Sequence, residues 1–176
     1  QDGKIVIVTE DLRNGNGRAI KSKLWADNRV DKIEESVDAI IWLMKDTSLP
    51  PVLKINDPIL AATMGATLAT KRTSAERLVE GIDRERLVIE PYANPFRTYP
   101  LKDDYYKFKE LFEKGKVECY IFNTGFFIDK KIPKEVTLNS LEKIVNGEAD
   151  FRPLGNIKAV QYLPIEGFEI NMEYIN

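Results

Sequence analysis

An apolar run that ends in a turn and then leads into a helix constrains the fold of this chain most strongly. Residues 117–122, Val-Glu-Cys-Tyr-Ile-Phe, have the composition of a buried strand. The strand ends at Asn123-Thr124-Gly125, and the following helix is predicted to end at Asn146-Gly147. The apolar face predicted for this helix consists of Leu138, Leu141, Ile144 and Val145. A turn between a strand and a helix lies at the carboxyl edge of a sheet, where open α/β sheets bind ligands.

The rest of the chain alternates between strand and helix signals. Extended segments are predicted at 4–8, 18–25, 37–44, 87–89, 160–163 and 167–170, with a hairpin turn at 14–17. Residues 37–44 are apolar and long enough to form a central strand. The Leu-Pro-Pro-Val sequence at 49–52 predicts an irregular loop, because consecutive prolines prevent both helix and ladder pairing.

Two further helices are predicted from their end signals. The first starts at Asp57-Pro58, with Asp at the cap and Pro at the first position, and runs to about Lys71. The second covers 103–114, with Tyr106, Leu111 and the neighbouring aromatic residues on its apolar side, and ends at Gly115. Strands and helices mixed in this order predict an α/β or α+β fold, in one domain that spans residues 1–176.

Composition excludes several classes of function. The chain has 26 basic and 28 acidic residues, a net charge of −2 with interspersed signs, which argues against nucleic-acid or membrane-surface binding. No apolar run approaches the roughly 18 residues of a membrane span. The chain has no histidine, so imidazole chemistry is excluded within it.

Its one cysteine, Cys119, lies in an apolar run and is predicted to be a buried strand residue, which fits a reducing, cytoplasmic compartment. The start at Gln1 predicts a fragment or a processed product.

The segment after Asn123-Thr124-Gly125 carries groups that suit a nucleotide. Lys131 and Thr137 lie just before and at the first turn of the predicted helix, where backbone N–H groups favour anions. Phe126 and Phe127 offer flat faces on which a base could stack. The alternative is structural: the phenylalanines belong to the core, Lys131 is solvated, and Thr137 is a hydroxyl at the start of a helix.

Five short segments resemble one enzyme family when they are taken in order. They are Leu49-Pro50-Pro51-Val52 after an apolar strand, Gly65-Ala66-Thr67 through Lys71 with Glu76-Arg77, Asn94-Pro95-Phe96, Asn123-Thr124-Gly125-Phe126, and Asn146-Gly147. Together they resemble the ATP-dependent phosphoenolpyruvate carboxykinases, over roughly residues 28 to 150. The resemblance implies the carboxyl-terminal lobe of such an enzyme, a mixed α/β domain that covers ATP.

The resemblance also implies roles for particular residues. Arg29, in Asn28-Arg29-Val30, matches the family's arginine that contacts the γ-phosphate and the transferred phosphoryl group. Its alternative is a surface cation paired with a neighbouring aspartate. Lys131 falls on an adenine-side arginine and Thr137 on an adenine-contacting threonine. Asn123 and Phe126 fall in the turn beside them, so all four are implied to bind the nucleotide.

The reaction that the resemblance implies needs groups that this chain lacks. The family decarboxylates oxaloacetate and phosphorylates the enolate from ATP, with Mg²⁺ or Mn²⁺ neutralising charge. The chain has no Gly-x-x-x-x-Gly-Lys-Ser/Thr phosphate loop. We therefore expect the phosphate loop and the metal site in an amino-terminal half that acts as the partner of this lobe, and we expect the fragment alone to be inactive.

Departures from the family pattern keep other functions open. Lys131 replaces an arginine, Phe126 replaces a tryptophan, and residues 127–129 replace glycines. A non-catalytic ligand-binding or interaction module with the same fold is the first alternative. A kinase that uses the same phosphate machinery on another substrate is the second.

Overall fold

The computed structural model describes residues 34–72, 80–83, 85–94 and 97–172. The predicted elements at 4–8, 14–17 and 18–25, and Arg29 itself, lie outside these ranges. Internal contacts divide the chain into two compact units. One unit comprises Gln1–Glu35 with Lys71–Arg86, and the other comprises Ser36–Thr70 with Leu87–Asn176. The sheet and the helices described below belong to the second unit, and the single domain stays a prediction.

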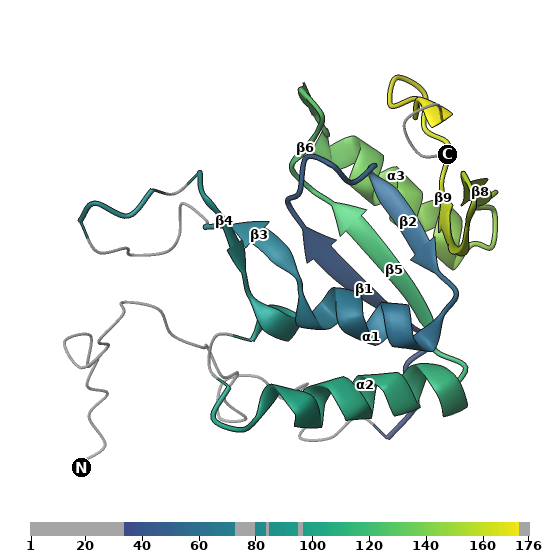
Figure 1. Ribbon diagram of the computed structural model, residues 1–176. Coiled ribbons are helices and arrows are strands. Elements are labelled where there is room, and N and C mark those ends of the chain that lie inside the picture. The colour runs from purple at the N-terminus through teal and green to yellow at the C-terminus, as the bar shows by residue number, and fades with distance from the viewer. Residues whose placement is uncertain (1–33, 73–79, 84, 95–96, 173–176) are drawn as a thin grey trace, which may run out of the picture. The chain divides into compact units, whose positions relative to one another are not determined.

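A five-stranded mixed sheet forms the centre of the second unit, which confirms the α/β fold (Figure 1). Its strands run in the order β1-β5-β2-β9-β8. Their bounds are β1 Ala39–Met44, β5 Glu118–Asn123, β2 Val52–Ile55, β9 Ile157–Tyr162 and β8 Arg152–Leu154. β5 pairs parallel with β1 and antiparallel with β2. The carboxyl ends of β1 and β5 therefore meet at one edge of the sheet.

Helices cover both faces of this sheet. On one face lie α1 (Pro58–Ala66) and α2 (Leu101–Lys114), and on the other lies α3 (Lys134–Val145) (Figure 1). The remaining elements are short: the 3₁₀ turn η1 (Pro91–Ala93), the ribbon of β3 (Ala69–Lys71) with β4 (Leu87–Ile89), and the ribbon of β6 (Phe126–Phe127) with β7 (Lys130–Lys131). Strand 87–89 and the strand before Asn123 are confirmed.

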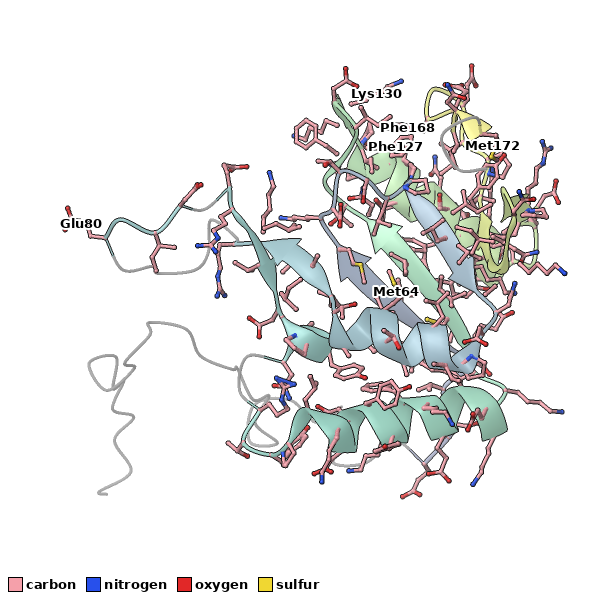
Figure 2. The ribbon with its side chains drawn as sticks, in the orientation of Figure 1. Met64, Glu80, Phe127, Lys130, Phe168 and Met172 are labelled. Carbon is pink, nitrogen blue, oxygen red and sulfur yellow. The ribbon has the colours of Figure 1, made fainter. Side chains whose placement is uncertain are left out.

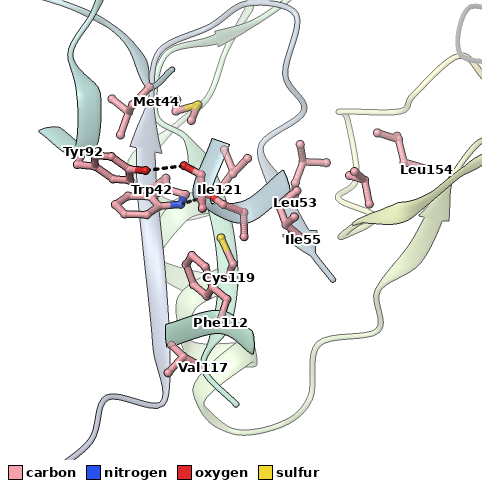
Figure 3. Packing of buried hydrophobic residues seen from close by; sticks show 14 residues of the cluster. Trp42, Met44, Leu53, Ile55, Tyr92, Phe112, Val117, Cys119, Ile121 and Leu154 are labelled. Carbon is pink, nitrogen blue, oxygen red and sulfur yellow. Dashed lines mark hydrogen bonds between the residues drawn. The ribbon is translucent and has the colours of Figure 1, made fainter. Parts of the chain in front are cut away.

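The larger core lies between the sheet and α1 and α2 (Figure 3). The indole N–H of Trp42 donates to the carbonyl of Ala61 at 3.3 Å, and the hydroxyl of Tyr92 donates to the carbonyl of Ala62 at 2.9 Å. Both rings pack closely against α1 at Gly65, where an added Cβ would lie 2.6 Å from a Tyr92 ring carbon and 2.8 Å from a Trp42 ring carbon. A smaller cluster around Val52, Tyr120 and Phe122 lies on the α3 side.

The start of α1 is confirmed and its end is not. The carboxylate of Asp57 accepts the N–H of Leu60 at 2.7 Å, and Pro58 occupies the first helical position. The helix ends at Ala66 instead of Lys71. The residues beyond it pair as β3 with β4, and Leu68 is buried, so tertiary packing overrides the helical preference of the Ala-rich run.

Two strand predictions also need correction. Residues 39–44 form a strand, but β1 lies at the edge of the described sheet instead of its centre, with Leu43 56% exposed. The middle position belongs to β2, which begins at Val52, within the predicted loop at 49–52. It is a four-residue strand between Pro51 and Asn56, too short to give a clear alternation signal.

The apolar faces predicted for α2 and α3 were partly wrong. On α2, Leu111 and the neighbouring aromatics Tyr105, Phe108 and Phe112 pack on the core as predicted, but Tyr106 is 65% exposed. On α3 only Ile144 of the predicted face is half-buried, and Leu138, Leu141 and Val145 are exposed. The buried residue is Ser140, at 4% exposure. The covered face of α3 is therefore Val136, Ser140 and Ile144, spaced four residues apart, of which Ile144 packs on the cluster of Val52, Tyr120 and Phe122.

Cys119 is buried on β5, as predicted, and burial raises the pKa of its thiol to about 12. The thiolate is the reactive form, so at pH 8 the native protein holds almost no nucleophile at this position. We expect iodoacetamide to leave Cys119 unlabelled in the folded chain at pH 8 and to label it fully in denaturant. Mass spectrometry of both samples checks this, and fast labelling of the native chain would contradict it.

Candidate functional site

The β6–β7 ribbon follows β5 at the carboxyl edge of the sheet. Phe126 pairs with Lys131 and Phe127 pairs with Lys130, so each pair places its side chains on one face of the ribbon. Phe127 is buried and Phe126 is 41% exposed, which distinguishes a core-facing side from an open side. The N–H of Ile132 donates to the carbonyl of Gly125 at 2.9 Å and closes the base of the ribbon.

Asn123 joins the turn to the loop after β1. Its side-chain NH₂ group lies 2.8 Å from the carbonyl oxygen of Asp46, 2.6 Å from that of Leu49 and 2.8 Å from that of Phe126, so its two hydrogens are shared among three acceptors. Its amide oxygen accepts the N–H of Gly125 at 3.0 Å. The residue is 1% exposed. This burial favours a structural role for Asn123 over the predicted ligand contact. Its side chain holds the turn against the loop after β1.

A pocket of about 630 Å³ lies between β7 and the first turns of α3. It is lined by Thr124, Lys131, Ile132, Pro133, Lys134, Glu135, Thr137 and Leu138. Thr124 sits where β5 ends, and its N–H donates to the carbonyl of Met44 at the end of β1, at 2.9 Å. The pocket therefore lies at the carboxyl edge of the parallel pair, which is where such sheets bind ligands.

The chemistry of the lining suits a ligand with an apolar body and an acceptor or anionic group. Ile132, Pro133 and Leu138 supply apolar surface, and Lys131 and Lys134 supply two cations against the carboxylate of Glu135. Pro133 occupies the N-cap of α3 and contributes no side-chain acceptor to its first N–H groups. The positive end of the helix thus adds to the two lysines.

The structure brings two of the predicted site residues into one pocket. Lys131 and Thr137 both line it. Phe126 stands opposite Lys131 on the open face of the ribbon but outside the lining. Arg29, the predicted catalytic residue, lies outside the described residues. Roles in ligand binding remain predictions for all of them.

Thr124, Lys134 and Glu135 line the pocket and were not predicted. The sequence did carry a signal for Lys134 and Glu135. Both lie between the predicted site residues Lys131 and Thr137, at the start of the same helix. Thr124 carried no such signal, since its place depends on how the ends of β1 and β5 meet.

Ile128, at the tip of the ribbon, has a left-handed backbone with φ of 57°. This conformation costs a residue with a Cβ about 1–2 kcal/mol, whereas glycine adopts it freely at an entropic cost of about 0.5–1 kcal/mol. The side chain is 69% exposed, so little burial is lost on its removal.

We expect Ile128→Gly to raise the free energy of unfolding by about 0.5–1 kcal/mol, measured by urea denaturation. Ile157→Gly is the control, because it removes the same side chain from strand β9, and it is expected to destabilise. A loss of stability in Ile128→Gly would contradict the assignment of strain.

Comparison with known proteins adds one relative. Phosphoenolpyruvate carboxykinase (ATP) from Aeropyrum pernix is 26% identical to this chain over 141 residues. This chain is similar to a carboxykinase. The match covers 80% of the chain but 27% of the carboxykinase, so the chain corresponds to about a quarter of that relative's length. No family model matches the chain. The comparison supports a distant, carboxykinase-like relationship, in agreement with the resemblance of the short segments.

Two further observations concern the described residues alone. None of their helices has the length and hydropathy that a bilayer-spanning segment needs. Within the same ranges, no three Cys, Asp or Glu side chains are grouped in a way that could hold a metal ion. Metal binding by an amino-terminal half stays a prediction.

Proposed function

We propose that this chain is the nucleotide-binding, carboxyl-terminal lobe of a carboxykinase-like phosphotransferase. Its pocket between β7 and α3 holds the base side of ATP. The observation that carries the proposal is that Lys131 and Thr137, six positions apart, line one pocket at the carboxyl edge of the sheet. The similarity to phosphoenolpyruvate carboxykinase (ATP) supports it independently.

In this proposal the polar and the apolar lining residues contact different parts of the base. The hydroxyl of Thr137 and the ammonium of Lys131 meet polar groups of the ring, while Ile132 and Leu138 meet its apolar surface. Phe126, on the same face of the ribbon as Lys131, extends the flat surface beyond the pocket. Charge-assisted hydrogen bonds contribute about 1.5–3 kcal/mol each, so one or two of them give a dissociation constant near the millimolar range.

The chemical step belongs to the full-length protein. There the amino-terminal half supplies the phosphate loop and the divalent metal, and Arg29 neutralises the phosphoryl group during transfer from ATP. Oxaloacetate is the proposed carbon substrate: it loses CO₂, and the resulting enolate oxygen takes the γ-phosphoryl group of ATP, which gives phosphoenolpyruvate and ADP. A variant of this proposal has another acceptor for the phosphoryl group. The lobe alone is proposed to bind ATP weakly and to catalyse nothing.

A non-catalytic ligand-binding module is the second candidate. It is favoured by the bulky residues 127–129 at the tip of the ribbon, where Ile128 occupies a left-handed conformation that suits glycine. A side chain at this position keeps a ligand further from the backbone than glycine does. Such a module would keep the pocket but bind a ligand other than ATP.

A titration of the chain with ATP, followed by amide chemical shifts, tests the proposal. We expect shifts at Lys131 to Leu138 with a dissociation constant near the millimolar range, and about tenfold weaker binding in Lys131→Met. Lys102→Met, which removes an exposed lysine from α2, is the matched control and is expected to bind as the unchanged chain does. Shifts confined to other parts of the chain, or equal binding by both variants, would contradict the assignment of the pocket.

A further inference from the structure

The β6–β7 ribbon is too small to keep its shape by itself. Each of its strands has two residues, and even a full hairpin in isolation is marginally stable in water. Its tip includes Ile128 in a strained backbone conformation. Yet the ribbon carries Lys131, one of the polar groups in the pocket. Something outside the ribbon must therefore hold it in place.

Besides the bonds that join Phe126 to Asn123 and Ile128 to Thr47, one support is a turn formed by residues 165–169. Phe168 is buried with Phe127 and Ile132 in a small cluster of its own. The N–H of Phe168 donates to the carbonyl of Ile165 at 3.0 Å, and the N–H of Gly167 donates to the carboxylate of Glu169 at 2.7 Å. Gly167 has φ of 78°, which favours glycine. The turn is thus internally fixed and can act as a support.

Lys130 connects the ribbon to this turn. Its ammonium donates to the carbonyl of Gly167 at 2.5 Å and lies 4.7 Å from the centre of the Phe168 ring (Figure 2). Glu169 stands nearby: hydrogen bonds from its own N–H and that of Gly167 lower the pKa of its carboxyl group, and the charge of Lys130 lowers it further. The neighbouring Lys131 lies on the other face of the ribbon and lines the pocket.

We infer that Lys130 is a positioning residue for the pocket: by joining the ribbon to the turn at 165–169 it fixes the place of Lys131. This inference rests on the proposed function. Adjacent residues of a strand point to opposite faces, so a side chain held on one face sets the position of the next residue on the other face. The two adjacent lysines therefore have different roles: Lys130 holds the ribbon in place, and Lys131 contacts the ligand in the pocket.

The test compares Lys130→Met with Lys130→Arg. Methionine keeps much of the length of lysine without the charge or the donor, whereas arginine can both donate to the Gly167 carbonyl and stack on Phe168. Lys107→Met, on an exposed position of α2, is the control for the loss of one surface charge. Three quantities are measured for each variant: the melting temperature, amide hydrogen exchange, and the dissociation constant for ATP.

Hydrogen exchange reports the ribbon without any ligand. The N–H groups of Ile132 and Ile128, bonded to the carbonyls of Gly125 and Thr47, are the reporters for the ribbon. The N–H of Asn56, bonded to the carbonyl of Ala159 between β2 and β9, is the reporter for the sheet. In Lys130→Met we expect about tenfold faster exchange of the first two and no change in the third.

For ATP we expect Lys130→Met to bind about tenfold more weakly at an unchanged melting temperature, and Lys130→Arg to bind as the unchanged chain does. A merely structural role would instead lower the melting temperature of the whole chain. Unchanged exchange at Ile132 and Ile128, or unchanged ATP affinity in Lys130→Met, would overturn the inference. If the unchanged chain does not bind ATP, the proposed function fails, and the exchange data still decide whether Lys130 holds the ribbon.

Discussion

Replacement of Asn123 by leucine is expected to lower the free energy of unfolding by about 3–5 kcal/mol, from several lost partners at about 1–3 kcal/mol each. The side chain of Asn123 serves three carbonyls, those of Asp46, Leu49 and Phe126, and accepts one N–H. Leucine has a similar size but no polar atom. Because Asn123 is only 1% exposed, water cannot reach the carbonyl and N–H groups that lose their partner unless the turn opens.

Urea denaturation of both chains measures this difference. Asn139→Leu, on an exposed position of α3, makes the same chemical change where nothing is buried, and we expect it to shift the free energy by less than about 0.5 kcal/mol. Since Asn123 joins the turn to the loop after β1, its loss should also weaken ATP binding by the proposed pocket. Equal stability of Asn123→Leu and Asn139→Leu would show that the bonds of Asn123 are dispensable.

Gly65→Ala is the second substitution with a large expected effect, and its sign opposes helix propensity. Inside a helix, alanine is ordinarily better than glycine by about 1 kcal/mol. At Gly65, however, the new methyl group would lie 2.6 Å from Tyr92 and 2.8 Å from Trp42, ring atoms of two buried residues. Neither ring can move freely, because each also donates a hydrogen bond to α1. We expect a net loss of about 1–3 kcal/mol in the free energy of unfolding.

A double-mutant cycle identifies the cause of that loss. Tyr92→Leu removes the ring that approaches Gly65 most closely, so Gly65→Ala should cost less in the Tyr92→Leu background than alone. Thr63→Ala, on the same helix, controls for the general effect of alanine in α1. A gain in stability for Gly65→Ala in the unchanged background would mean that the helix can shift away from the rings.

Local signals in the sequence predicted the elements whose ends are fixed by local chemistry. The cap at Asp57, the glycine after α2 and the turn after β5 were found because each depends on residues within one helical turn. The central position of β2 and the edge position of β1 were missed, because strand order depends on pairing between distant segments. The covered face of α3 was missed for the same reason, because it is set by packing against distant segments, as the contact of Ile144 with the cluster of Val52, Tyr120 and Phe122 shows.

The candidate site was predictable to a similar degree. Lys131 and Thr137 could be placed together because they flank the start of one helix, and the structure places both in one pocket. The burial of Asn123 could not be foreseen, since two of its carbonyl partners belong to residues 74 and 77 positions earlier in the chain. Thr124 was missed for the same reason, because its neighbour Met44 belongs to β1.

The strand order β1-β5-β2 has a consequence for how the chain folds. β1 and β2 are consecutive in the sequence and run antiparallel to each other, but β5 separates them in the native sheet. During synthesis β1 and β2 are available long before β5, and pairing them directly would give a local hairpin of the wrong order. The native sheet instead places β5 between them, and its first residue, Glu118, pairs with Ala39, which lies far earlier in the chain. Because β5 must pair with two strands from far earlier in the sequence, we expect this sheet to fold more slowly than one built of consecutive hairpins.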